Sequence, residues 1–172
     1  MSGVAAVVLA AGAATRYGSA KQRVFLPYVL ERLAATSVGE VVVVEGAYPL
    51  DPVAGVRLVS CPDWARGPGA SLRCGLAALA ENVEAALVVL ADGPRLDPRA
   101  VERLLEHRHD ADVVVASYDG TRDHPAVLSR GVWSRVPDEG ARALDATLVA
   151  CDDLEPPGDI DYPQLWQPPE GD

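Results

Sequence analysis

The sequence predicts an α/β protein with a mostly parallel central sheet and helices on both of its faces. Strand-like and helix-like segments alternate along the chain, and the strand-like ones are short, apolar and rich in valine. Hydrophobic residues make up 49% of the 172 residues, enough to bury a full core. We therefore expect a three-layer α/β/α sandwich in which residues 1–172 form one domain, with an acidic, proline-rich segment at 152–172.

The first expected element is the apolar run Val4–Leu9, which is short enough to be a strand buried on both faces. A loop of small residues follows, and Pro27 is expected to open a helix that runs to about Thr36. Two strands are expected next, at 40–44 and 56–60. A helix over 69–81, whose leucines share one face, and a strand at 85–91 follow them.

In the second half, Asp97 is expected to cap a helix whose first turn holds Pro98. A strand at 112–116 follows, and beyond it the pattern weakens. The remaining expectations are a short strand at 126–128, part of a helix at 140–144 and an irregular end from residue 156.

The net charge of −10 is concentrated near the C-terminus. Of the 25 acidic residues, eight lie in 143–172, where there is no lysine or arginine, which leaves 17 against 15 basic residues elsewhere. Such a chain lacks the basic footprint of a nucleic-acid binder, so we expect no nucleic-acid partner. The sequence has no apolar run of transmembrane length, and its N-terminal run lacks a basic flank, so we expect no membrane partner and no leader.

The three cysteines, Cys61, Cys74 and Cys151, are odd in number and widely spaced, with no C-x-x-C pair. We therefore expect neither a disulfide framework nor a zinc site, and we expect a cytoplasmic protein.

The loop after the first strand carries the clearest chemical signal. Lys21 is the only lysine, while the other fourteen basic residues are arginines. Residues 10–14 have almost no side-chain bulk, so their N–H groups can approach a ligand closely. Arg16 and Lys21 add a planar guanidinium and an ammonium on a flexible stem. Backbone donors and these two cations together suit a polyphosphate.

Two other phosphate-binding loops do not fit. The dinucleotide pattern G-x-G-x-x-G needs three glycines, but after Gly12 the next glycine is Gly18. The P-loop needs a lysine directly after its second glycine, whereas Ser19 follows Gly18.

The loop resembles the L-A-x-G-x-S-x-R-x-G-x-x-K signature of nucleotidyltransferases similar to the molybdenum cofactor cytidylyltransferase and guanylyltransferase enzymes. Thr15 stands one place later than the usual small or hydroxyl residue. The resemblance implies a Rossmann-like nucleotidyltransferase fold of the GT-A type and Mg²⁺-dependent transfer from a nucleoside triphosphate. The residues on the pattern are Leu9, Ala10, Gly12, Arg16, Gly18 and Lys21.

Two further segments carry the expected nucleotide and metal residues. Residues 67–76 look like the family's G-x-x-x-S-L-x-x-G-L helix start, where N–H groups near Gly69 and the Ser71 hydroxyl would contact the nucleotide. A simple capped helix, with Gly75 allowing close packing, is the alternative. Asp92, at the end of an apolar strand, resembles the aspartate of the family's G-D-x-P and is the best Mg²⁺ ligand candidate, although Asp-Gly-Pro is also a strong turn signal.

The C-terminal half carries weaker matches. Residues 159–163 resemble the family's D-I-D-T-P, which makes Asp161 the expected second metal ligand, although Tyr162 replaces the threonine and the aspartates could be incidental in so acidic a tail. His124-Pro125 and the G-x-R-x-L match at 140–144 resemble segments that face the acceptor in the family. His124 could contact an acceptor phosphate, but a turn or packing role is at least as common, and we do not assign it a catalytic one.

The resemblance implies transfer of a nucleoside monophosphate to a small phosphorylated acceptor such as molybdopterin, with Arg16, Lys21 and Asp92 as catalytic residues. Backbone groups of residues 9–12 would hold the base. In the family, L-A-A-G is associated with CTP and L-A-G-G with GTP, so Ala11 favours CTP. Two alternatives remain open: a glycosyltransferase of similar fold that uses a nucleotide sugar, and a non-catalytic nucleotide-binding module. The loop after Lys21 is also shorter than in relatives, which leaves the acceptor open.

Overall fold

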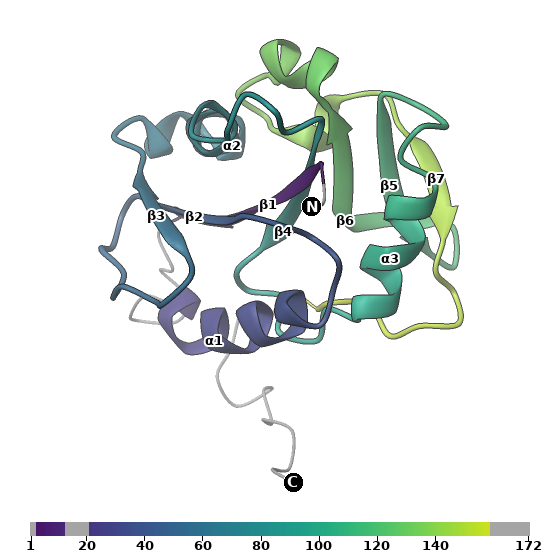
Figure 1. The fold of residues 1–172 in the computed structure, drawn as a ribbon, viewed down its shortest axis with the longest axis horizontal. Helices are drawn as coiled ribbons and strands as arrows, with labels where there is room; N and C mark the ends of the chain where they lie inside the picture. The colour runs from purple at the N-terminus through teal and green to yellow at the C-terminus, as the bar shows by residue number, and fades with distance from the viewer. Residues whose placement is uncertain (1–2, 13–20, 159–172) are drawn as a thin grey trace, which may run out of the picture.

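The computed structural model describes residues 3–12 and 21–158, whose strands form one sheet of seven. In sequence order the strands are β1 (Val4–Ala10), β2 (Val41–Glu45), β3 (Arg57–Ser60), β4 (Ala85–Leu90), β5 (Val113–Tyr118), β6 (Thr121–Ser129) and β7 (Thr147–Ala150). Their order in space is β3-β2-β1-β4-β6-β5-β7 (Figure 1). Neighbours run parallel except at β6, which is antiparallel to both β4 and β5. The predicted α/β class with a mostly parallel sheet is confirmed.

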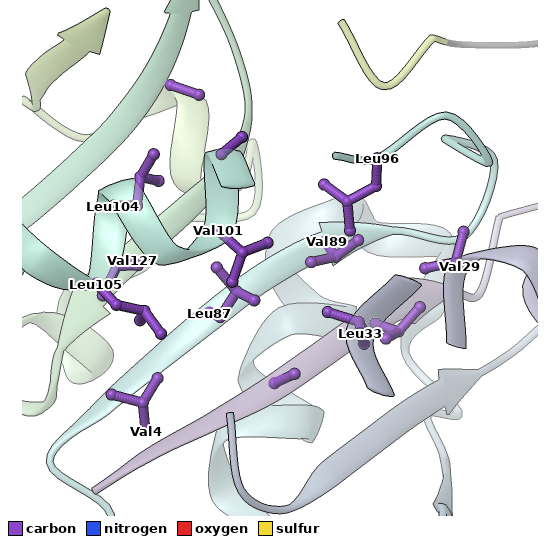
Figure 2. Packing of buried hydrophobic residues seen from close by; sticks show 14 of the residues in the cluster. Val4, Val29, Leu33, Leu87, Val89, Leu96, Val101, Leu104, Leu105 and Val127 are labelled. Atoms are coloured by element: carbon purple, nitrogen blue, oxygen red, sulfur yellow. The ribbon is translucent and has the colours of Figure 1, made fainter. Parts of the chain in front are cut away.

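Helices cover both faces of this sheet. They are α1 (Lys21–Ala34), α2 (Pro68–Ala77) and α3 (Pro98–Glu106), with α1 and α3 on one face and α2 on the other (Figure 1). Successive side chains of β1 point to opposite faces of the sheet, so they enter two separate hydrophobic cores. Val4 lies in one core with Leu33 of α1 and Leu104 of α3 (Figure 2), and Val8 belongs to the same core. Val7 instead packs with the leucines of α2. β1 is therefore buried on both faces, as its composition predicted.

Gly75 allows α2 to lie close to the sheet. A Cβ at this position would come within 2.5 Å of Val7 Cγ1 and 2.9 Å of Val44 Cγ2. We expect Gly75→Ala to lower the free energy of unfolding by about 1–3 kcal/mol, because overpacking outweighs the better helix propensity of alanine. Gly131→Ala is the matched control, since its added Cβ has no neighbour within 4 Å. Urea denaturation of both variants checks this, and equal stabilities would contradict it.

The prediction that Pro27 opens the first helix was wrong. Helix α1 begins at Lys21, and Pro27 lies inside it. Proline is common at a first helical position but is tolerated further in when packing offsets the lost hydrogen bond. Here Phe25, which is fully buried, and Leu26, which is buried, precede the proline. The tertiary contacts of this turn override the local preference.

Two elements of the second half differ from their predicted extents. β6 begins at Thr121, five residues before the predicted strand, because Asp119 and Gly120 form a two-residue turn with positive φ that pairs β6 back onto β5. The expected helix at 140–144 is only a 3₁₀ turn, η4 (Ala141–Ala143). The Asp97 cap is confirmed: its carboxylate accepts the Arg99 N–H at 2.9 Å, and the hydrogen bond from the Arg99 side chain lowers the pKa of Asp97.

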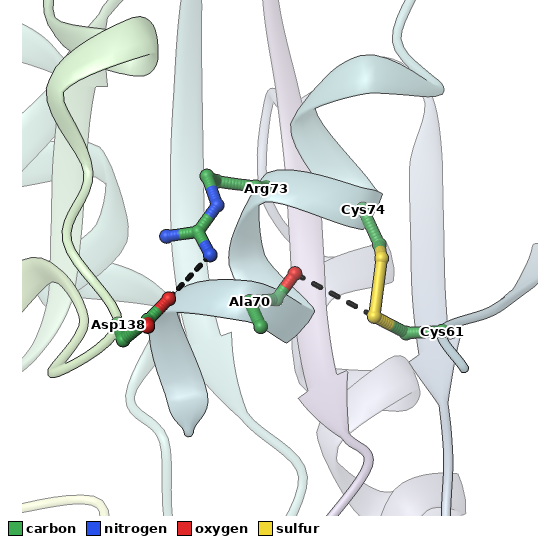
Figure 3. The surroundings of a disulfide bond; sticks show 5 residues. All are labelled: Cys61, Ala70, Arg73, Cys74 and Asp138. Carbon is green, nitrogen blue, oxygen red and sulfur yellow. Dashed lines mark hydrogen bonds and ion pairs between the residues drawn. A yellow bond between two sulfur atoms is a disulfide. The ribbon is translucent and has the colours of Figure 1, made fainter. Parts of the chain in front are cut away.

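The expectation of no disulfide framework missed one disulfide. Cys61 and Cys74 are joined by a disulfide, with their Cα atoms 5.9 Å apart (Figure 3). Cys61 directly follows β3 and Cys74 lies in α2, so the packing of α2 beside β3 brings together residues whose spacing gives no signal. Cys151 is a free, buried thiol.

Candidate functional site

The candidate site lies where β1 and β4 end side by side. From β1 the chain continues to β2 and β3 on one side, whereas β4 lies on the other side of β1, so the sheet changes direction at this pair. Open α/β sheets bind ligands at the carboxyl ends of strands at such a point. Because β6 runs antiparallel to β4, its first residues, 121–124, reach the same edge. The topology therefore brings three segments together.

A first cavity, of about 310 Å³, opens between β1, β4 and the start of α2; we call it the Asp92 cavity. Five residues that the sequence singled out meet here: Leu9, Ala11, Gly12, Ser71 and Asp92. The remaining lining residues are Trp64, Gly67, Pro68 and Leu90. Trp64 was not predicted to be part of the site, since a lone aromatic residue in the short 3₁₀ turn η2 (Trp64–Arg66) gives no functional signal.

A second cavity, of about 340 Å³, lies beside it; we call it the Arg142 cavity. Leu9, Pro68 and Leu90 line both cavities, so the two share a wall. Most of the other lining is apolar, from Leu72, Val88, Val115, Ala126, Gly140 and Ala141, and the polar part comes from Arg122, Asp123, His124, Glu139 and Arg142.

The two arginines of the Arg142 cavity differ in their contacts. Arg122 donates to the carbonyl oxygens of Ala141 at 2.8 Å and Leu144 at 2.9 Å, so it holds η4 in place. Arg142 is exposed and forms no ion pair or hydrogen bond with the described part of the chain. Its guanidinium is therefore available to a ligand anion at the cavity rim.

His124 lines the Arg142 cavity and lies against the turn that follows Asp92. A side chain at Gly93 would overlap the His124 ring, so that ring packs directly against the turn that follows Asp92. The peptide bond between His124 and Pro125 is cis. His124 therefore has a packing role, one of the two roles considered for it from the sequence.

A clamp holds residues 136–140 on the start of α2. Arg73 donates to the Val136 carbonyl at 2.8 Å and to the Asp138 carboxylate at 2.5 Å, and Arg66 approaches the same carboxylate at 3.3 Å. The hydrogen bond from Arg73 lowers the pKa of Asp138, and the Arg66 charge adds to this. The clamp fixes the wall formed by residues 139–142 relative to α2.

The backbone near the Asp92 cavity is partly occupied by internal contacts. The Gly69 N–H donates to the Asp138 carbonyl at 2.9 Å, so this predicted nucleotide donor already has a partner. The carbonyl groups of Leu9 and Ala11 accept N–H groups of Ala91 and Ala47, at 3.0 and 3.1 Å. Ala10 is 3% exposed and lines neither cavity, which gives it a place in the core.

Three predicted site residues lie wholly or in part outside the described residues: Arg16, Asp161 and the side chain of Lys21; Asp159, whose part was left open, lies outside them too. Within residues 3–12 and 21–158, no group of three or more histidine, cysteine, aspartate or glutamate residues is placed to hold a metal. Asp92 is the predicted metal ligand that the structure places at the edge of the sheet. The roles of the others stay predictions.

The seven-stranded, mostly parallel sheet with helices on both faces is a Rossmann-like α/β fold. The model of the MobA-like NTP transferase domain family matches residues 6–150, and the chain belongs to that family.

Among curated proteins, the bifunctional protein GlmU of Sorangium cellulosum (strain So ce56) is 33% identical over 132 residues. That match covers 64% of this chain and 28% of GlmU, so the chain spans well under a third of that relative.

Among solved structures, Rv0371c of Mycobacterium tuberculosis H37Rv is 23% identical with a TM-score of 0.79, covering 92% of this chain and 93% of that one. A second structure of Rv0371c is a complex with manganese (21% identical, TM-score 0.74, 89% and 90% covered). CMP:2-keto-3-deoxy-manno-octonic acid synthetase complexed with CTP is 14% identical, with a TM-score of 0.69 and 94% of both chains covered. Because all three sequence identities are below 25%, these similarities support the fold alone.

The described part of the chain has no helix that is both long and apolar enough to cross a bilayer.

Proposed function

We propose that this protein transfers CMP from CTP to a small phosphorylated acceptor, such as molybdopterin, and releases pyrophosphate. The observation that carries the proposal is the pair of cavities with a shared wall of Leu9, Pro68 and Leu90. Transfer between two substrates requires that both lie against each other at one edge of the sheet, and two adjoining cavities meet that requirement. In this proposal residues 1–172 work as one domain in the cytoplasm, where nucleoside triphosphates are abundant.

In the proposed reaction, an acceptor phosphate oxygen attacks the α-phosphorus of CTP in line, and pyrophosphate leaves. Mg²⁺, held by Asp92 and Asp161, would neutralise charge on the phosphate oxygens. A carboxylate at the end of β4 fits this ion, which prefers hard oxygen ligands and needs only one or two from the protein. Arg16 and Lys21 would neutralise the charge that grows on the pyrophosphate. The manganese complex of Rv0371c supports a divalent metal in general, and Mg²⁺ is our choice for this chain.

The Arg142 cavity supports an acceptor with a flat ring face, polar ring edges and one anionic group. Its lining is mostly apolar, and its polar part comes from Asp123, His124, Glu139 and Arg142 beside Arg122, which already donates to two carbonyl groups. The exposed guanidinium of Arg142, which has no ion pair with the described residues, suits a phosphate at the rim.

Nucleotide selectivity gives the first test. With Mg²⁺ present, we expect CTP to raise the melting temperature more than ATP, GTP or UTP at equal concentration, because selective binding stabilises by mass action. Ala11→Gly recreates the L-A-G-G form and should narrow or reverse the preference for CTP over GTP. Thermal shift with all four triphosphates checks both, and Gly131→Ala should keep the wild-type ranking. GTP or ATP binding at least as tightly as CTP would refute the CTP assignment.

Pyrophosphate release separates this proposal from the two alternatives. A glycosyltransferase would consume a nucleotide sugar and release no pyrophosphate, and a non-catalytic module would bind CTP without turnover. CTP mixed with Mg²⁺ and an acceptor should therefore yield pyrophosphate only if the proposal holds.

A further inference from the structure

The disulfide between Cys61 and Cys74 closes a loop that forms one wall of the Asp92 cavity. Cys61 follows β3 and Cys74 lies in α2, 13 residues later. Four of the nine residues lining the cavity lie between them: Trp64, Gly67, Pro68 and Ser71. The disulfide therefore joins both ends of the segment that contacts whatever fills this cavity.

The segment between β3 and α2 is held to the sheet by the hydrogen bond from the Cys61 N–H to the Glu45 carbonyl and by the packing of Trp64 against Gly46, and its other backbone bonds are local. The N–H groups of Trp64, Arg66 and Gly67 all donate to carbonyl groups within residues 61–64. On its far side, α2 is held by the ion pair between Arg73 and Asp138 (Figure 3). The disulfide is the covalent tie on the near side, so its reduction leaves η2 held by the noncovalent contacts of Trp64 alone.

We propose that Cys61 and Cys74 form a redox-responsive modification site that sets the affinity of the Asp92 cavity for its nucleotide. This inference rests on the proposed function. The closed disulfide holds the wall in its binding geometry, and the reduced pair lets the wall sample other geometries, which lowers the apparent affinity. A disulfide in a reducing compartment is commonly transient or sensing rather than permanent.

The chemistry requires a dithiol reductant. Cys61 is 2% exposed, whereas Cys74 is half-buried, so an incoming thiolate reaches the Cys74 sulfur first. It forms a mixed disulfide there, and Cys61 leaves as a thiolate that takes up a proton. The second thiol of the reductant then releases Cys74, so that two electrons and two protons pass to the pair and the reductant becomes a cyclic disulfide. Diamide, which accepts two electrons and two protons, reverses the process.

Thiol counting and nucleotide binding test the inference on the full chain. Protein treated with diamide should show one alkylated thiol after denaturation, from Cys151, and protein treated with dithiothreitol should show three. The oxidised form should melt roughly 6–12 °C higher. It should bind CTP with Mg²⁺ at least roughly fivefold more tightly by calorimetry. Cys74→Ser should bind like the reduced protein in either buffer, and Cys151→Ser should keep the full response.

The outcomes separate this inference from the proposed function. Three alkylated thiols after diamide treatment, or equal CTP affinity in the two states, overturns the redox site and leaves nucleotide binding standing. No binding of any of the four triphosphates in either state overturns both. A Cys61→Ser variant that still responds to dithiothreitol also overturns the assignment.

Discussion

Replacement of Lys21 by alanine should reduce turnover by about 10²–10³-fold or more while the protein stays folded. Lys21 is the only lysine of the chain and begins α1, the first helix after β1. In the proposed reaction its ammonium neutralises charge on the departing pyrophosphate, and that charge is largest in the transition state. The loss should therefore appear mainly in kcat. Pyrophosphate release with CTP, Mg²⁺ and acceptor measures it.

Arg32→Ala is the matched control for Lys21→Ala. Arg32 lies in the last turn of the same helix, and α1 leads into β2, so this cation sits at the opposite edge of the sheet. Its removal should leave turnover within about twofold of wild type. Circular dichroism and melting temperature establish that both variants fold. Wild-type activity in Lys21→Ala would refute the role assigned to the lysine.

Replacement of Asp92 by asparagine should reduce turnover by about 10³-fold, because the variant keeps the shape of the side chain and loses the charge that holds the metal. Metal stabilisation of a phosphoryl transition state is worth several kcal/mol, which corresponds to a factor of this size. Asp92 lines the cavity at the end of β4, so the change acts where the triphosphate is expected to lie. Binding of Mn²⁺, followed by paramagnetic resonance, should weaken in parallel.

Asp110→Asn controls for the loss of one negative charge. Asp110 is exposed, and its Oδ2 lies 2.7 Å from Nδ1 of His107. Because Asp110 precedes β5, it lies at the edge of the sheet opposite Asp92. Its Mn²⁺ affinity and turnover should match the wild type. If Asp92→Asn bound Mn²⁺ as well as Asp110→Asn does, Asp92 would not be a metal ligand.

The fold could be predicted because its signals are local. The strands β1 and β4 are runs of valine, alanine and leucine that are almost wholly buried, and β2 is four valines followed by a glutamate, with a buried centre. The Asp97 cap of α3 and the buried leucines of α2 could likewise be predicted from neighbouring residues in the sequence. Asp92 could be placed at the edge of the sheet for the same reason, since a polar residue at the end of a buried strand emerges there.

The parts that could not be predicted depend on tertiary contacts. The disulfide joins two segments whose proximity follows only from the packing of α2 beside β3. The early start of α1 depends on the burial of Phe25. The Gly69 N–H donates to the Asp138 carbonyl only because the clamp brings residues 136–140 against α2. The early start of β6 is different, because the Asp119-Gly120 turn is a local hairpin signal that could have been recognised.

The most direct test of the central claim follows the fate of CTP when the protein is mixed with Mg²⁺ and molybdopterin. We expect mass spectrometry to find an acceptor that has gained CMP, with pyrophosphate released in equal amount. Free CMP without an acceptor adduct, or an adduct formed only when a nucleotide sugar replaces CTP, would contradict the assignment as a cytidylyltransferase.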